Sequence, residues 1–339
     1  MVSIQLNTIQ TFTNYLQSAH VKLYQKSNLV KAVSGNSMSL NNIKTNHNMM
    51  SSAFMLLAMA SYAIGDAIVK LISSEMPLGQ ILFTRGLFAV ILLFIITHKK
   101  QQLRPFSTIL KKPFALRIFG EIFASYFFLT ALFQMPIANA AAIMQALPLT
   151  ITLATAYFFK ETIGWRRMVA ILIGLLGVIL IIQPGLDGFN IFSLYCLLAV
   201  IGCTIRDVAT RGLSKDTPTI FVTLVTVIVI TLFGGLLGFT EKWTPPTLYS
   251  TSILFVASIV LSIGFIAIIS SMRIGEVAVV TPFRYSILIF AILIGAFLFN
   301  EIPNILTIMG SIIVVGSGIY TIYREHMANK KLEKFSLAS

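Results

Sequence analysis

Three ionisable side chains lie deep inside long apolar stretches of the chain: Arg85, Glu121 and Arg284. Placing a charge in the hydrocarbon of a membrane costs about 2.5 to 3.5 kcal/mol on insertion scales, so each residue is a candidate functional group. Glu121 and Arg284 each lie about eight residues, roughly 12 Å along a helix, from the same side of the predicted bundle. This equal depth predicts that they pair, either as a structural link or as groups that bind a solute or a proton. Arg85 has a similar depth from the opposite side. The alternative to a functional role for Arg85 is that it hydrogen-bonds backbone carbonyls or snorkels outward.

Uncharged side chains near these charges could hydrogen-bond a polar solute while presenting a ring to it, although most aromatic residues simply pack. The candidates are Tyr62, Tyr126, Gln145 and Tyr285. Pro148 and Pro282 interrupt two of the apolar stretches, and a proline inside such a helix frees a carbonyl and kinks the backbone.

Two acid–base pairs with four-residue spacing lie near the ends of apolar stretches: Asp66 with Lys70, and Asp207 with Arg211. This spacing puts both side chains of a pair on one helix face. We therefore expect local ion pairs that stabilise helix ends, with a role in a gate as the alternative.

The chain lacks the residue sets of several other chemistries. Its four histidines fall outside the apolar stretches, which argues against a proton relay, a haem or a zinc site there. The sequence has no phosphate-binding P-loop and no serine or cysteine triad within these stretches. Cys196 and Cys203 share one helix face too far apart for a disulfide, so we expect two small buried hydrophobes. We predict no enzyme activity, no metal and no cofactor.

Composition predicts the elements that hold these residues. Of 339 residues, 56% are hydrophobic and 11% are charged, and the mean hydropathy is +0.86. Soluble domains carry about 25% charged residues, so a water-soluble protein is excluded. The apolar residues form ten runs of roughly membrane-spanning length, which must be helical because lipid-exposed backbone has to satisfy its own hydrogen bonds. The runs are 51–72, 78–97, 114–133, 137–159, 167–182, 189–210, 219–239, 248–271, 276–299 and 304–323.

The net charge is +13, and most Lys and Arg residues lie in the loops and the C-terminal tail. Loops after even-numbered runs, together with the C-terminal tail, hold fifteen Lys and Arg residues, whereas loops after odd-numbered runs hold Lys242 alone. The positive-inside rule therefore puts both termini in the cytoplasm. The same distribution argues against nucleic acid as a partner. The lipid bilayer is the expected surrounding medium, and a homodimer is an open alternative to a monomer.

The chain contains an internal repeat. A shift of 141 residues puts Asp66 on Asp207 and Lys70 on Arg211, and a shift of 140 puts Glu161 on Glu301. Because each repeat holds five spans, the two copies must cross the membrane in opposite senses. The sequence thus predicts an all-α membrane protein with a disordered polar tail at 1–50. The alternative is that the protein truly starts at Met49 or Met50. The two five-helix repeats at 51–185 and 186–323 are followed by a basic tail at 324–339. Inverted repeats of this kind favour a secondary transporter with one central site.

These features resemble the drug/metabolite transporter superfamily with its paired EamA domains. The resemblance rests on ten spans in two halves, a proline-interrupted fourth span ending at Phe158 to Glu161, and a ninth ending at Leu298 to Glu301. The stretches Met144 to Leu149, Arg206 to Arg211 and Thr281 to Tyr285 look more specifically like the riboflavin-transporter branch.

The resemblance implies a multi-pass protein of the bacterial inner membrane that moves a small polar metabolite, with riboflavin uptake as the first expectation. A flavin ring would stack on aromatic side chains, and its sugar-alcohol tail would need partners such as Gln145 and Arg284. An efflux permease for amino acids and an S-adenosylmethionine transporter are the alternatives within this class. A scaffold or receptor that transports nothing is the alternative outside it.

Overall fold

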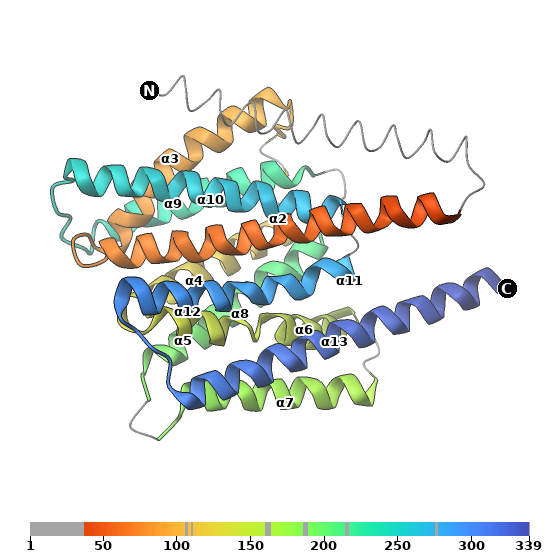
Figure 1. The fold of residues 1–339 in the computed structure, drawn as a ribbon. Coiled ribbons are helices and arrows are strands. Elements are labelled where there is room, and N and C mark those ends of the chain that lie inside the picture. Colours follow the sequence, from red (N-terminus) through yellow and green to blue (C-terminus); the bar gives the residue numbers. More distant parts are fainter. Residues whose placement is uncertain are drawn as a thin grey trace.

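The computed structural model describes residues 37–338 except for 106–107, 110, 160–163, 186–188, 214–216 and 275–276. The regular elements of the described part are all helices, and it contains no strand (Figure 1). Its elements are α2 (Ser37–Ile72), α3 (Leu78–Lys99), α4 (Lys112–Gln134), α5 (Ile137–Met144), α6 (Leu147–Phe159), α7 (Trp165–Ile182), α8 (Phe192–Arg211), α9 (Thr219–Leu237), α10 (Leu248–Ile274), α11 (Val277–Val280), the 3-10 helix η2 (Thr281–Tyr285), α12 (Ser286–Phe299) and α13 (Ile305–Ala338).

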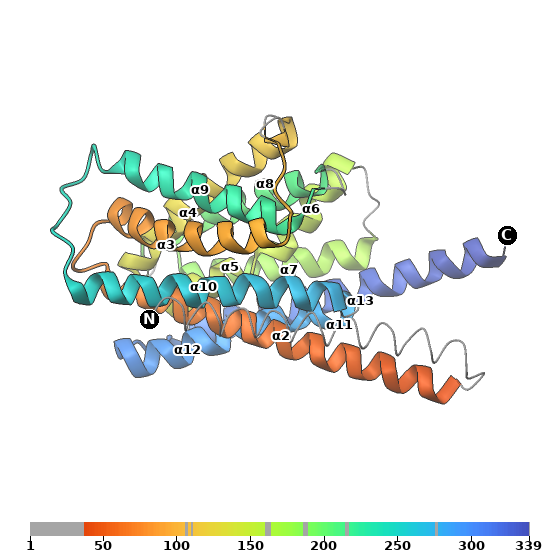
Figure 2. The same cartoon turned by 90° about the horizontal axis from the view of Figure 1, so that it is seen from above.

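Ten helical segments among the described residues are long and apolar enough to cross a membrane, which confirms the ten predicted spans. They run roughly along one direction and form a bundle (Figures 1 and 2). The chain is therefore a multi-pass membrane protein with an all-α fold.

Two spans are broken at corresponding positions. The fourth span consists of α5 and α6 with a turn at Gln145, and the ninth consists of α11, η2 and α12. Pro148 lies in the first turn of α6 and Pro282 lies in η2, because proline lacks the N–H that a continuous helix would need. Gln145 and Tyr285 are 140 positions apart (285 − 145 = 140), the offset already found between the repeats.

Four helix pairs dominate the packing: α4 with α8, α2 with α10, α3 with α9, and α7 with α13. Each pair takes one helix from each predicted repeat. If span n of the first repeat corresponds to span n + 5 of the second, the first two pairs exchange with each other and the last two map onto themselves. This is the pairing that a two-fold pseudo-axis between inverted repeats requires.

Glycines let the paired helices approach closely, as small residues do in membrane bundles. A Cβ atom on Gly120 of α4 would lie 2.7 Å from the backbone nitrogen of Arg206 and from the carbonyl oxygen of Gly202, both in α8. In the α7–α13 pair, a Cβ on Gly310 would lie 2.6 Å from the carbonyl oxygen of Gly177. Larger side chains at these positions would push the helices apart.

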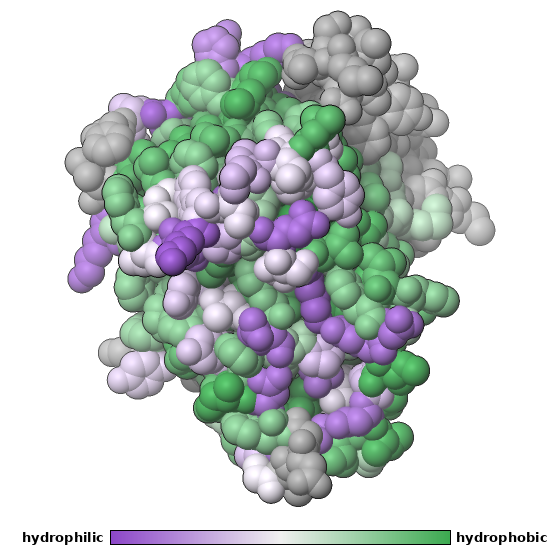
Figure 3. Space-filling model, turned by 90° about the vertical axis from the view of Figure 1, so that its left-hand side faces the viewer, coloured by the Kyte–Doolittle hydropathy of each residue, from purple (hydrophilic) through white to green (hydrophobic). Residues whose placement is uncertain are grey.

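The bundle has two ends of different character. We call the end where α2 begins and α13 finishes the terminal end (right in Figure 1), and the opposite end the distal end. At the distal end the Gln183 and Asn304 side chains exchange hydrogen bonds of 2.9 and 3.1 Å, and the Gln80 side chain does the same with the Thr244 backbone at 2.6 and 3.0 Å. Figure 3 shows this end as a face of hydrophilic side chains set among hydrophobic ones.

The two predicted tails differ in part from the structure. Residues 1–36 lie outside the described residues, but the chain is already helical from Ser37, so α2 takes up the last part of the predicted polar tail. No proline or glycine lies between Ser37 and the first span to stop the helix. The predicted basic tail at 324–339 likewise continues α13 as far as Ala338.

Candidate functional site

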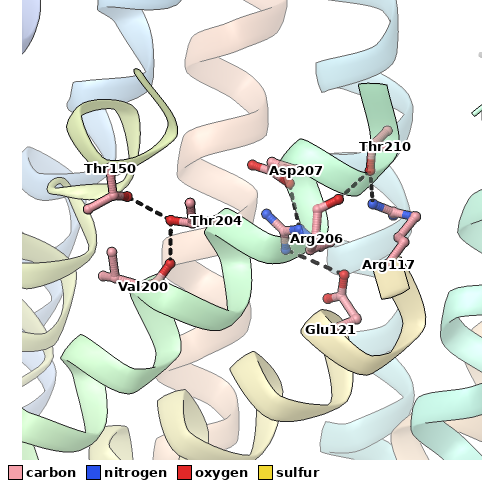
Figure 4. A network of polar contacts seen from close by, with 8 residues as sticks. All are labelled: Arg117, Glu121, Thr150, Val200, Thr204, Arg206, Asp207 and Thr210. Atoms are coloured by element: carbon pink, nitrogen blue, oxygen red, sulfur yellow. Dashed lines mark hydrogen bonds and ion pairs between the residues drawn. The ribbon is translucent and has the colours of Figure 1, made fainter. Parts of the chain in front are cut away.

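The α4–α8 pair carries an ion-pair network inside the bundle (Figure 4). Arg206 of α8 lies at its centre, with one guanidinium nitrogen 3.4 Å from Oε2 of Glu121 and its Nε donating to Oδ1 of Asp207 at 2.6 Å. The three side chains are 19 to 26% exposed, so they are largely shielded from solvent. The close approach at Gly120, next to Glu121 in sequence, brings the carboxylate within reach of Arg206.

Hydroxyl groups extend this network along α8. Arg117 donates to Oγ1 of Thr210 at 2.7 Å, and Thr210 donates to the carbonyl of Arg206 at 2.6 Å. On the other side, the hydroxyls of Thr150 and Thr204 lie 2.7 Å apart, which ties α6 to α8 (Figure 4). These bonds hold the Arg206 turn of α8 between α4 and α6.

Tyr62 of α2 and Cys203 of α8 have the same interior charges as electrostatic neighbours. Tyr62 lies within electrostatic range of Glu121, Arg206 and Arg284, and Cys203 lies within range of the same three residues. We call Tyr62, Glu121, Arg206, Asp207 and Arg284 the charged cluster. Its members come from α2, α4, α8 and η2, that is, from both predicted repeats.

Arg284 is the unpaired cation of this cluster. Its guanidinium makes no hydrogen bond or ion pair within 4.0 Å to any described residue. It lies on η2, which packs against α2 and α13. The neighbouring Tyr285 is 4% exposed and packs against Gly318 of α13, where any Cβ would overlap its hydroxyl. The break in the ninth span therefore presents a guanidinium that has an unused hydrogen-bonding capacity.

The predicted pair of Glu121 with Arg284 is wrong as a direct contact. Glu121 pairs with Arg206 instead, because α4 packs closely on α8 whereas η2 packs on other helices. The partner of Glu121 was determined by which helices pack against each other, and not by equal depth along the membrane normal.

Of the uncharged candidates, Gln145 lies at the turn between α5 and α6 and is 7% exposed. Its side chain makes no hydrogen bond to any residue that the structure describes. Tyr126 lies further along α4, edge-on to Phe127 at 5.3 Å and to Phe233 at 6.2 Å. The structure therefore places Tyr126 in an aromatic contact and not among the charges.

Asp66 and Arg85 lie toward the distal end, on α2 and α3. They interact electrostatically with each other, and Asp66 is also within range of Tyr62. Neither side chain makes a hydrogen bond or ion pair within 4.0 Å to a described residue. Together they form a second charged region between the charged cluster and the distal end.

Of the two predicted pairs with four-residue spacing, Asp66 with Lys70 is not the contact that forms. Lys70 pairs with Oε1 of Glu301 at 2.5 Å and donates to the carbonyl of Met135 at 2.7 Å, because two acceptors fixed at helix ends meet it there. Asp207 pairs with its neighbour Arg206. The side chain of Arg211 lies outside the described residues, as does Glu161.

Arg206 and Glu301 are the two partners that sequence reasoning did not select. Arg206 stands beside Asp207 in the sixth span at a depth close to that of Glu121, and this was the available signal. No set of three or more His, Cys, Asp or Glu side chains in the described ranges is arranged to hold a metal ion.

Comparison with known proteins supplies the last observation. The profile of the EamA-like transporter family matches residues 49–183 and 190–324. An S-adenosylmethionine uptake transporter of Rickettsia bellii is 26% identical over 283 residues, which cover 82% of this chain and 95% of the relative. A riboflavin transporter of Vibrio cholerae is 25% identical over 79% of this chain and 91% of its own length.

A pseudopaline exporter of Pseudomonas aeruginosa is 23% identical and matches 79% of this chain and 94% of its own length. A solved crystal structure that is 18% identical covers 82% of this chain and 97% of its own, with a TM-score of 0.56. At this identity the structural match supports the fold alone.

Proposed function

Because the chain belongs to the EamA-like transporter family, we propose that it is a secondary transporter that moves a small polar metabolite by alternating access. The ten apolar helices and the transporter relatives support a multi-pass carrier and give no support to an enzyme. The charged cluster, to which both repeats contribute, is the proposed central site.

We assign the membrane and orientation from charge and from the relatives. The loops after even-numbered spans and the C-terminal tail hold fifteen Lys and Arg residues against one in the loops after odd-numbered spans, which favours a cytoplasmic terminal end. The transporter relatives are bacterial, so the inner membrane of a bacterium is the proposed location.

For the substrate we favour a charged amino-acid derivative, with S-adenosylmethionine taken up into the cell as the first candidate. The observation that carries this choice is that the unpaired guanidinium of Arg284 lies within electrostatic range of Cys203, as do the carboxylates of Glu121 and Asp207. S-adenosylmethionine has a carboxylate that could pair with Arg284, and ammonium and sulfonium cations that could lie near Glu121 and Asp207. Charge-assisted hydrogen bonds to the carboxylate and the ammonium group are roughly twice as strong as neutral ones.

Riboflavin, the first expectation from the sequence, is the second candidate. The Vibrio cholerae relative supports it, as do the ring contacts of Tyr126, on which a flat heterocycle could stack. Riboflavin carries no net charge at neutral pH, however, so it would leave the Arg284 guanidinium without a partner.

Uptake into a bacterium that has no importer for either compound separates the two candidates. We expect cells that express the chain to take up labelled S-adenosylmethionine saturably, with competition by the unlabelled compound and not by riboflavin. The reverse pattern would make riboflavin the substrate. Loss of preloaded label, with no uptake of either compound, would indicate an exporter.

A further inference from the structure

The two broken spans pack against each other at one end only. At the distal end, α5 packs against α12, where a Cβ on Gly295 would lie 3.1 Å from a methyl carbon of Ile137. Toward the terminal end, α6 packs mainly on α8, and the described residues show no comparable packing of α6 on η2 or α11. The structure is therefore asymmetric about its own pseudo-axis.

The pseudo-axis predicts which contacts a symmetric state of the protein would make. It exchanges the fourth span with the ninth and reverses their direction, so α5 corresponds to α11 and η2, and α6 corresponds to α12. A symmetric state would pair α6 with η2 as closely as it pairs α5 with α12. The observed state is closed between these spans at the distal end and separated between them at the other.

The carboxylate of Glu301 links three helices at the closed distal end. Oε1 of Glu301, just after α12, pairs with Nζ of Lys70 at 2.5 Å, and Oε2 accepts the backbone N–H of Ile137 at 2.9 Å. Lys70 also donates to the carbonyl of Met135, and its ammonium lies 5.0 Å from the centre of the Phe299 ring. The contact thus joins the last turn of α2, the first residues of α5 and the end of α12.

The geometry points to the Lys70–Glu301 contact as the latch that keeps the distal end closed and that must break when substrate exchanges there, an assignment that rests on the proposed transport function. The side chains are 10% and 22% exposed, so both charges regain water as they separate. The backbone groups of Met135 and Ile137 that the latch satisfies lie at helix ends, where water can replace the lost partners.

The amide pair of Gln183 and Asn304 at this end does not have the same role. Gln183 and Asn304 join α7 to α13, which also pack closely where Gly177 meets Gly310 and Gly174 meets Ser317. The bond between their amides therefore links helices that do not need to separate. Gln183→Asn shortens one amide and keeps a residue type that tolerates its left-handed backbone, with φ of 56°, so it serves as a matched control.

The test measures exposure of the α5–α12 contact. Cys196 and Cys203 are replaced by Ser and Ile137 by Cys, because Ile137 is 2% exposed against α12. A membrane-impermeant maleimide is then applied to intact cells and, separately, to inside-out vesicles. We expect slow labelling of the parent and about tenfold faster labelling, from the distal side alone, after Glu301→Gln or Lys70→Met.

Equal labelling rates in the parent and both latch variants would overturn the assignment, as would an equal acceleration by Gln183→Asn. Lys70→Met removes the ammonium and leaves Glu301 in place, so the two variants check each other against misfolding. The labelling needs no substrate. Faster labelling without transport of any compound would therefore keep the latch and reject the proposed function.

Discussion

Tyr62 and Cys203, which are 141 positions apart (203 − 62 = 141), lie within electrostatic range of the same three charged side chains, Glu121, Arg206 and Arg284. Asp66 follows the first by four residues, and Asp207 follows the second by four. Equivalent turns of α2 and α8 thus both lie near these charges. A site built in this way is reached from either side through equivalent helices, as alternating access requires.

Arg284→Ala should impair substrate binding and not insertion into the membrane. Losing a charge-assisted contact costs about 1.5 to 3 kcal/mol, so we expect the KM for uptake to rise by about tenfold to a hundredfold at an unchanged membrane level. Arg166→Ala is the control, because that guanidinium lies over the Trp165 ring, 5.4 Å from its centre, outside the charged cluster. Normal uptake by Arg284→Ala would remove Arg284 from the site.

Arg206→Gln should destabilise the protein more than the double variant Glu121→Gln, Arg206→Gln. The single change leaves two carboxylates without their cation, whereas the double change also removes one of these charges. Because the groups are partly exposed, we expect a difference of about 1 kcal/mol in unfolding free energy. Thermal unfolding of these two variants, of Glu121→Gln alone and of the parent in detergent measures it. Additive effects of the two single changes would show that Glu121 and Arg206 do not interact.

Glu121→Gln alone tests coupling. If the carrier couples transport to protons, neutralising Glu121 should abolish the dependence of uptake on external pH, because Glu121 is one of the two carboxylates that face Arg206. The readout is uptake against pH in the parent and the variant. An unchanged pH profile would remove Glu121 from coupling and leave it as the structural partner of Arg206.

Gly120→Ala should separate α4 from α8. The added methyl would meet backbone atoms of α8 at 2.7 Å, which cannot move without shifting the helix. Overpacking of this kind costs typically 1 to 3 kcal/mol, so the melting temperature should fall by several degrees. Gly65→Ala is the matched control, since nothing lies within 4 Å of its Cβ, and equal melting temperatures for the two variants would contradict the packing argument.

A disulfide between the broken spans should arrest transport. With Ile137→Cys and Gly295→Cys in a background free of other cysteines, the close approach of these positions permits a bridge. Oxidation should stop uptake, and a reducing agent should restore it, because the distal end must open in each cycle. Each single-cysteine variant is the control, and full uptake by the oxidised double variant would show that α5 and α12 need not separate.

Much of the fold could be predicted because its signals are local. The length and polarity of each run determined ten spans, and the prolines at 148 and 282 predicted the two breaks. The candidate residues were found by the cost of burying a charge, which needs no knowledge of neighbours. Pairing was predicted less well, since depth and helical spacing restrict partners without choosing among them.

The sequence by itself determined that this is a ten-span, two-repeat membrane protein with charges in its interior, because hydropathy, charge and repeat offset are read along one chain. Only the tertiary structure decided that Glu121 meets Arg206 and that Lys70 meets Glu301. Those contacts depend on which helices pack together, and that depends on close approaches such as Gly120 on Gly202, which join residues from different repeats. The closed distal end was likewise decided by packing, because both repeats carry the same elements and only their arrangement distinguishes one end from the other.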